Sequence, residues 1–265
     1  MYIRGKPSIL HRVAFELRYR YGFTYLDRCG KTINAIMKIS PEWMPKSDQV
    51  SPQNAPMVST VNQCVFNFSY QKLDLAIDQP ANNEISQAEI DRFCEQVGSV
   101  SSVVVEQLGL KEFPRIGFRS WHLFPCKDRE EAERWLGTIG LFSVPGQVAS
   151  SFEGEIESVG AAIVIAGLDR NYRIGLNGVE RAAMLDLGSE ILAVRASGLS
   201  KDQDKVFKRQ NRQPGRLFGQ PQFAAMIDID CYQNDPDSIE PEDFVRTSLQ
   251  ESRRRIEAAT TNKGE

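Results

Sequence analysis

Alternating apolar and polar side chains predict several strands along this chain. From Val13 to Tyr21 every second residue is apolar and most of the intervening residues are charged, as in a half-buried strand. The runs Phe66–Tyr70 and Leu73–Ile77 alternate in the same way and lie close together, so they predict a hairpin. The apolar run Ala161–Ala166 is joined by a turn to Tyr172–Asn177, which predicts a second hairpin.

Apolar residues at three- and four-residue spacing predict helices. The longest such run extends from Ile90 to Leu108; Ser86 and Glu89 form a capping box ahead of it, and Gly109 ends it. Pro241 begins a C-terminal helix, because proline loses no hydrogen bond at the first helical position. Shorter helices are predicted near 33–37 and 128–136, and a further strand over 223–232.

The order of these elements predicts an α+β protein. Up to residue 126 they follow the order strand–helix–strand–strand–helix–strand, which is the order of a ferredoxin-like split βαβ unit. The remainder is richer in strands. We therefore predict a ferredoxin-like α+β half over residues 1–126, coupled to an antiparallel β-rich half over 127–265 that contains a long basic loop (197–220) and the C-terminal helix.

Composition narrows the class of protein. The 265 residues carry a formal net charge of −3, which argues against a surface coated in basic residues for non-specific nucleic-acid binding. No apolar run approaches the roughly 18 residues of a membrane span. The five cysteines are scattered and form no Cys-x-x-Cys pair, so we expect reduced thiols and a cytoplasmic protein.

Two segments that contain arginine echo one another. Gly109–Phe118 and Gly167–Leu176 share half of their aligned residues, including an Arg-Ile-Gly triplet. In a strand, Arg115 and Arg119 project from the same face. Because the planar guanidinium group matches carboxylate and phosphate, Arg115, Arg119 and Arg173 are candidate anion-binding residues.

Acidic residues offer a structural explanation for the same arginines, because carboxylates on a neighbouring strand would pair with them across the sheet. The candidates are Glu153, Glu155, Glu157, Asp228 and Asp230. Asp228 and Asp230 share one strand face, roughly 7 Å apart, so they are also candidate Mg²⁺ ligands of a metal-dependent hydrolase. No histidine or glutamate at a recognisable spacing completes such a site, which favours the ion pairs.

The segment 197–220 is polar, is interrupted by proline and glycine, and carries an excess of basic residues. Phenylalanines lie between the basic residues, a combination that can follow a nucleic-acid backbone and stack on its bases. Nucleic-acid binding through residues 201–216 is therefore an alternative function. Its candidate contacts are Lys205, Lys208, Arg209, Arg212 and Arg216.

The candidate motifs for catalysis or cofactor binding are incomplete. Gly30–Thr32 lies where a phosphate-binding loop would join a strand to a helix, but Tyr25 stands where that loop needs a glycine. His11 and His122 have no Cys, Ser or Asp neighbour at triad spacing, and we expect His122 to pack or cap at the end of its strand. We therefore expect no cofactor and favour a non-enzymatic protein.

Two short motifs carry a resemblance to known proteins: Phe113–Arg119 after the long helix, and Ala225–Asp230 before the terminal helix. They resemble those of a large, loosely related family of uncharacterised bacterial proteins of similar length. The resemblance implies a soluble bacterial protein of a kind often encoded in mobile-element or defence regions, and it carries over no active-site residues. We predict a binding or assembly subunit that contacts a second copy of itself or another protein, and not a membrane.

Overall fold

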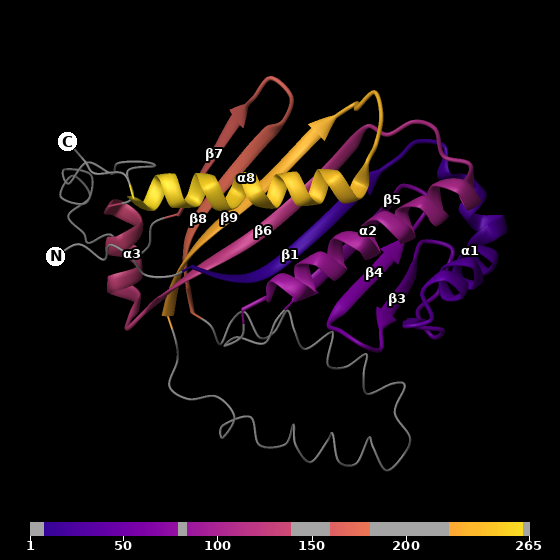
Figure 1. Ribbon diagram of the computed structural model, residues 1–265, viewed down its shortest axis with the longest axis horizontal. Helices are drawn as coiled ribbons and strands as arrows, with labels where there is room; N and C mark the ends of the chain where they lie inside the picture. Colours follow the sequence, from indigo (N-terminus) through magenta and orange to yellow (C-terminus); the bar gives the residue numbers. More distant parts are fainter. Residues whose placement is uncertain (1–7, 79–83, 139–159, 181–222, 262–265) are drawn as a thin grey trace, which may run out of the picture.

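A single antiparallel sheet organises the described part of the chain. The structure is a computed structural model, and it describes residues 8–78, 84–138, 160–180 and 223–261. Within these ranges nine strands pair in the order β2-β3-β4-β5-β1-β6-β9-β8-β7, and Figure 1 shows two long helices crossing in front of the sheet. The predicted α+β class is therefore confirmed, in the form of four helices and one nine-stranded antiparallel sheet within the described ranges.

The bounds of the elements are as follows. The strands are β1 (Ile9–Arg18), β2 (Trp43–Pro45), β3 (Ala55–Ser59), β4 (Cys64–Phe68), β5 (Lys72–Asp78), β6 (Arg115–Cys126), β7 (Gly160–Ala166), β8 (Asn171–Glu180) and β9 (Phe223–Asn234). The helices are α1 (Tyr25–Ile39), α2 (Gln87–Leu108), α3 (Arg129–Thr138) and α8 (Pro241–Thr261), with a 3-10 turn η1 (Gly22–Thr24) before α1.

The four helices cover one face of the sheet. Alternate residues of β1, such as Val13, Phe15 and Leu17, are buried on that face and join the main core with α1, α2 and the start of α8. A smaller core lies under α3, where Trp135 packs on Phe124. The other face of the sheet carries none of the described helices, and it holds the polar members of each alternating strand.

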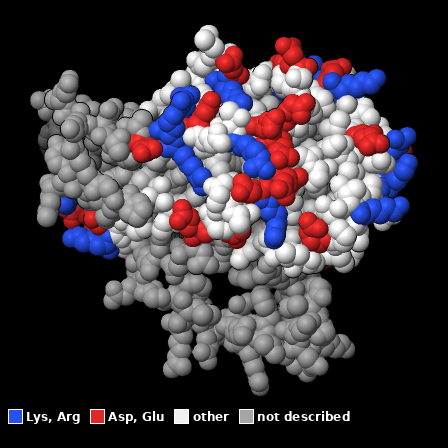
Figure 2. Space-filling view, in the orientation of Figure 1, with Lys and Arg blue, Asp and Glu red and all other residues white. Residues whose placement is uncertain are grey.

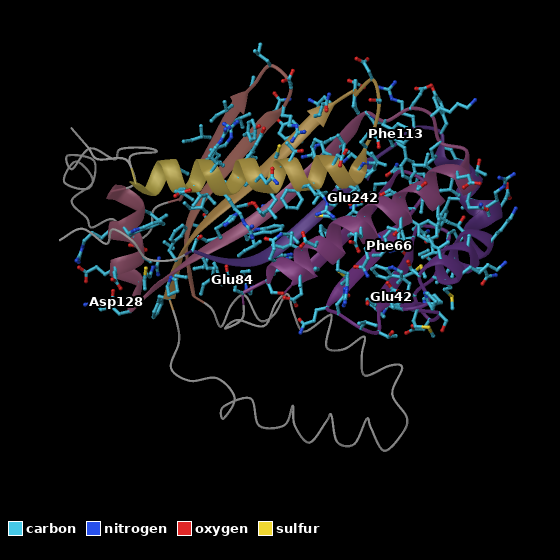
Figure 3. The ribbon with its side chains drawn as sticks, in the orientation of Figure 1. Glu42, Phe66, Glu84, Phe113, Asp128 and Glu242 are labelled. Carbon is cyan, nitrogen blue, oxygen red and sulfur yellow. The ribbon has the colours of Figure 1, made fainter. Side chains whose placement is uncertain are left out.

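Helices α2 and α8 pack side by side in opposite directions. Glu242, which is labelled in Figure 3, is near the start of α8 and lies against Gly98 of α2. Further along α8, Arg246 donates a hydrogen bond to Asp91 of α2 at 3.2 Å. Acidic and basic side chains are interspersed on this helix-covered side of the molecule (Figure 2). The pairing ties the C-terminal helix to the N-terminal half of the chain.

The ends of α2 are those that the sequence predicts. Ser86 accepts from the backbone N–H of Glu89 while the Glu89 carboxylate accepts from the backbone N–H of Ser86, which completes the capping box. Gly109 follows the helix with a φ of 64°, the left-handed conformation that glycine adopts without strain. Both hairpins are also confirmed, as β4–β5 and β7–β8.

Other sequence-based boundaries were wrong. The first strand ends at Arg18, and Tyr21 is a left-handed residue outside it that is 75% exposed. Gly30 does not separate a strand from a helix, because it lies inside α1, and no phosphate-binding loop is formed there. The short strands β2 and β3 were not predicted, because Pro45 and Pro56 interrupt their alternation.

The two predicted halves share the sheet. Strand β6, from the first half, pairs with β9 from the second along all 12 of its residues, and it pairs with β1 on its other side. The predicted loop 197–220 lies outside the described residues. None of the described helices is long and apolar enough to cross a membrane, and all five cysteines are free thiols.

His122 of β6 is a buried titratable group in the helix-covered layer. Its side chain is 2% exposed, and its Nε2 lies 3.1 Å from the hydroxyl oxygen of Ser120. Burial, with a smaller contribution from the positive charge of Arg253, lowers the pKa of His122 to about 3. The histidine therefore packs in the interior, as predicted, and remains neutral in the folded protein above that pH.

The buried His122 makes a pH-dependent contribution to stability. In the unfolded chain the imidazole binds a proton below about pH 6.5, whereas in the folded chain it stays neutral until about pH 3. Stability from this group is therefore lost as the pH falls below 6.5, at roughly 1.4 kcal/mol per pH unit. Denaturant titrations between pH 7 and 5 should show this slope, and His122→Gln should flatten it. Equal slopes in both proteins would contradict the buried, neutral histidine.

Candidate functional site

The helix-free face of the sheet brings together the predicted arginines and aspartates. Arg115 and Arg119 lie on β6, Asp228 and Asp230 on β9, and Arg173 on β8. The strand register places Asp230 directly between Arg119 on one side and Arg173 on the other. Strands β6 and β8, which carry the two Arg-Ile-Gly triplets, thus flank the same strand, and Arg115 and Arg173 project from the same face.

Arg115 is held between two carboxylates. Its Nη1 donates to Glu16 of β1 at 2.7 Å and its Nη2 donates to Asp230 of β9 at 2.8 Å. The guanidinium also lies over the ring of Tyr232, 4.7 Å from the centroid. The Arg115 guanidinium lies over Gly117, where a Cβ would be in van der Waals contact with the guanidinium carbon at 3.4 Å. Arg115 therefore bridges three strands at the centre of the sheet.

Arg119 forms a two-pronged ion pair with Asp228. Its Nε donates to one carboxylate oxygen of Asp228 at 2.7 Å, and its Nη2 donates to the other. The guanidinium also stacks on the ring of Trp121, and the guanidinium of Arg12 of β1 lies over the same ring. Bidentate pairing of this kind is among the strongest of hydrogen-bonded ion pairs. Both oxygens of Asp228 and much of the Arg119 guanidinium are therefore engaged within the protein.

Burial and the surrounding charges together shift the pKa values of the two acids that Arg115 bridges in opposite directions. Burial raises the pKa of Glu16, but Arg18, Lys72 and Arg115 together hold that pKa below its ordinary value. For Asp230 burial is the largest effect and raises the pKa above the ordinary value, although Arg115 and Arg119 oppose it. Of these two acids, Asp230 is therefore the one for which the effect of burial on the pKa exceeds that of the neighbouring arginines.

Arg173 differs from the other two arginines. It is exposed, and none of the described residues forms an ion pair or hydrogen bond with its side chain. Beside it lies a half-open hollow of about 370 Å³ whose floor includes Gly175 and whose lining contains Arg119, Asn177, Asp228 and Asp230. A second hollow of about 400 Å³ adjoins the same ion pairs over β1 and β5. Arg173 is therefore the candidate anion-binding arginine that has no ion-pair partner among the described residues.

The structure describes the candidate metal ligands but not the predicted basic loop. Asp228 and Asp230 do share one face, but three of their four carboxylate oxygens accept from guanidinium groups, so a metal ion held by both carboxylates would have to displace arginine. No cluster of acidic, histidine or cysteine side chains suited to a metal occurs among the described residues. Several predicted site residues lie outside the described ranges: Glu153, Glu155, Glu157, Lys205, Lys208, Arg209, Arg212 and Arg216.

Strand β7 forms a second notable surface at one edge of the sheet. It contains no charged residue and no proline, and its inner side pairs with β8 throughout. Val164 is 63% exposed and Ile165 is 41% exposed, and Leu168 in the following turn is fully exposed. No described strand pairs with the outer side of β7. Among the described residues, β7 is therefore an apolar edge strand with no partner on its outer side.

Sequence reasoning missed three participants in this face. Glu16 was recognised as a polar residue of its strand but not as the partner of Arg115, because the pairing of β1 with β6 is not evident from the sequence. Gly117, two residues after Arg115, was the available sequence signal that the Arg115 side chain lies along the sheet over that glycine. Trp121 lies between Arg12 and Arg119, and nothing in its local sequence indicates this.

Comparison with known proteins adds no identification. No model of a protein family matches the sequence, and no curated protein matches it either. The resemblance to a family of bacterial proteins therefore stays a prediction.

The bridge made by Arg115 should contribute measurably to stability. Its side chain is 20% exposed, and Arg115→Gln would leave Asp230 partly buried without the guanidinium that binds it. We expect a loss of about 1–3 kcal/mol in the free energy of unfolding, measured by denaturant titration. The control, Arg134→Gln, removes an exposed pair with Glu130 on α3 and should cost less than about 0.5 kcal/mol.

A second substitution separates this ion pair from general damage. Asp230→Asn removes the charge that Arg115 neutralises, so it should cost much less in the Arg115→Gln background than in the natural protein. A coupling free energy of about 1–2 kcal/mol is expected from such a double-mutant cycle. Strictly additive costs would show that the two side chains do not interact.

Proposed function

We propose that this protein is a non-enzymatic assembly subunit that self-associates through the outer edge of β7. The observation that carries the proposal is the apolar, uncharged edge strand with its backbone unpaired by any described strand. Proteins usually protect long edge strands with lysine, proline, a bulge or a covering segment, because an open edge is a template for another strand. β7 contains no lysine and no proline, its pairing with β8 shows no bulge, and no described segment pairs with its outer edge.

The opposite edge of the sheet supports the proposal by contrast. Strand β2 is only three residues long and ends in Pro45, so it offers few backbone groups for pairing. β7 is seven residues long and rich in β-branched side chains. Of the two edges, β7 is the one suited to adding a strand.

A second copy of β7 is the occupant that fits this edge. An antiparallel pair with its two-fold axis at Ile163, the middle residue, places each strand's apolar side chains opposite those of the other copy. The strand has no charge that such a pair would bury. Its sheet would continue from one chain into the next without interruption.

The chemistry of the open face supports a role other than catalysis. Arg115 and Arg119 are bound to carboxylates of the same sheet, and the aspartates that might hold a metal are bound to those arginines. Nucleic-acid binding through the segment 201–216 stays a prediction, as do a bacterial complex, a defence role and a cytoplasmic location. A metal-dependent hydrolase has no support from the geometry of Asp228 and Asp230.

We also propose that the first half is a ferredoxin-like split βαβ unit. Its support is the succession β1, α1, β4, β5, α2 and β6, together with the spatial order β4-β5-β1-β6 in the sheet. The strands β2 and β3 would then be an addition at one side of that unit, and β9, β8 and β7 an addition at the other.

Self-association is tested by light scattering of the purified protein across a range of concentrations. We expect a species of twice the 29.9 kDa chain mass. Val164→Glu places a carboxylate opposite Arg173 within the hairpin, so the hairpin should persist, while in the paired edge the carboxylates of the two copies would lie diagonally across the two-fold axis and repel each other. The dissociation constant of the dimer should rise at least tenfold, or about 1.4 kcal/mol.

The matched control adds the same charge outside the strand. Leu168→Glu lies in the fully exposed turn after β7 and should leave the dimer unchanged. Circular dichroism should show the same fold in both variants. A natural protein that stays monomeric at every concentration, or a Val164→Glu dimer as stable as the original, would overturn the proposal.

A further inference from the structure

We propose that the hollow above Gly175 is a binding site for a zwitterionic amino acid or for the carboxyl-terminal residue of a peptide, with Arg173 receiving the carboxylate. The proposal rests on the hollow and its polar lining and does not depend on self-association. It assigns a role to the one arginine of the echoing segments that has no partner among the described residues.

In the first Arg-Ile-Gly triplet, the arginine binds carboxylates within the sheet. Arg115 lies over the glycine two residues later, and its guanidinium reaches a carboxylate on each neighbouring strand. The missing side chain of Gly117 supplies the space. This copy of the triplet is filled by the protein's own ion pairs.

The second triplet is arranged alike but is left open. Gly175 lies between Asp228 of β9 and Ala162 of β7 in the register of the sheet, so small residues keep the space above it free. A Cβ at Gly175 would meet Asp228 at 3.5 Å, an ordinary contact, so an alanine fits there while taking space from the hollow that Gly175 lines. Arg173 stands beside this space instead of filling it with an ion pair.

The lining offers complementary polar groups. Arg173 can donate two parallel hydrogen bonds to a carboxylate, and the Asn177 amide lies beside the floor, 3.9 Å from a Cβ built at Gly175. Asp230 is engaged through Oδ2 by Arg115, and none of the described groups donates a hydrogen bond to its Oδ1. That oxygen can accept from an ammonium or amide N–H of the ligand.

The charge balance selects among oxyanions. Two arginines, Arg119 and Arg173, and two aspartates, Asp228 and Asp230, line the hollow, so the formal charges of its lining balance. A zwitterion, which carries one charge of each sign, matches this balance better than a phosphate dianion. The volume of about 370 Å³ lies at the lower end of the range for small-molecule sites, which suits a ligand of one residue.

Nuclear magnetic resonance titration tests this assignment, since the amide signals of Gly175 and Asn177 report on the floor of the hollow. The probes are glycine as the zwitterion, N-acetylglycine as the mimic of a peptide carboxyl terminus, and inorganic phosphate. For ligands this small we expect saturable shifts with dissociation constants on the order of millimolar. Tighter binding of glycine identifies a free amino acid, and tighter binding of N-acetylglycine identifies a peptide end.

Three variants locate the binding. Arg173→Gln should weaken it at least tenfold, and Gly175→Ala should weaken it by occupying the floor. The control is Arg18→Gln, which removes another exposed arginine of the open face that is paired with Glu16. This variant should bind the probes with the same dissociation constants as the natural protein. Shifts that do not saturate, an unaffected Arg173→Gln variant, or phosphate binding more tightly than both carboxylates would overturn the proposal. None of these results bears on the oligomeric state, so the two proposals fail separately.

Discussion

The pairing of β6 with β9 is the constraint on which the rest of this structure depends. It joins the strands of the N-terminal half to those of the C-terminal half along 12 residues, and its register decides which side chains meet on the open face. Because side chains alternate, a slip of one residue would turn Asp228 and Asp230 toward the helices and Ile229 toward solvent. The ion pairs of Arg115 and Arg119 with those aspartates are available only in the observed register, so they help to specify it.

The same ion pairs divide the arginines into two kinds. Arg115 and Arg119 look like anion-binding residues in the sequence, yet each is bound to carboxylates of neighbouring strands. Arg173 occupies the corresponding place on the far side of β9 and retains an open hollow. The candidate binding features therefore lie toward the β7 end of the sheet, where an arginine without an ion-pair partner among the described residues lies close to an apolar edge strand.

Local patterns predicted much of the fold. The alternation in Phe223–Tyr232 and the capping box at Ser86 depend on residues near one another in the chain, so the sequence alone revealed them. The order of strands could not be read in this way, because it depends on contacts between distant segments. Glu16 and Arg115 are 99 residues apart, and only the shared sheet brings them together. The sequence therefore offers several acidic partners for the arginines. The strand register brings Asp230 to Arg115 and Asp228 to Arg119.

Native-state hydrogen exchange in increasing denaturant tests most directly whether the β6–β9 pairing joins both halves into one cooperative sheet. The account predicts that the protected amides of β1, β6 and β9 exchange only through global unfolding, with free energies of opening within about 1 kcal/mol of one another. Opening of β9 with β8 at a distinctly lower free energy, while β1 and β6 stay protected, would contradict it. The halves would then be separate units, and the ion pairs between their strands would be incidental to the fold.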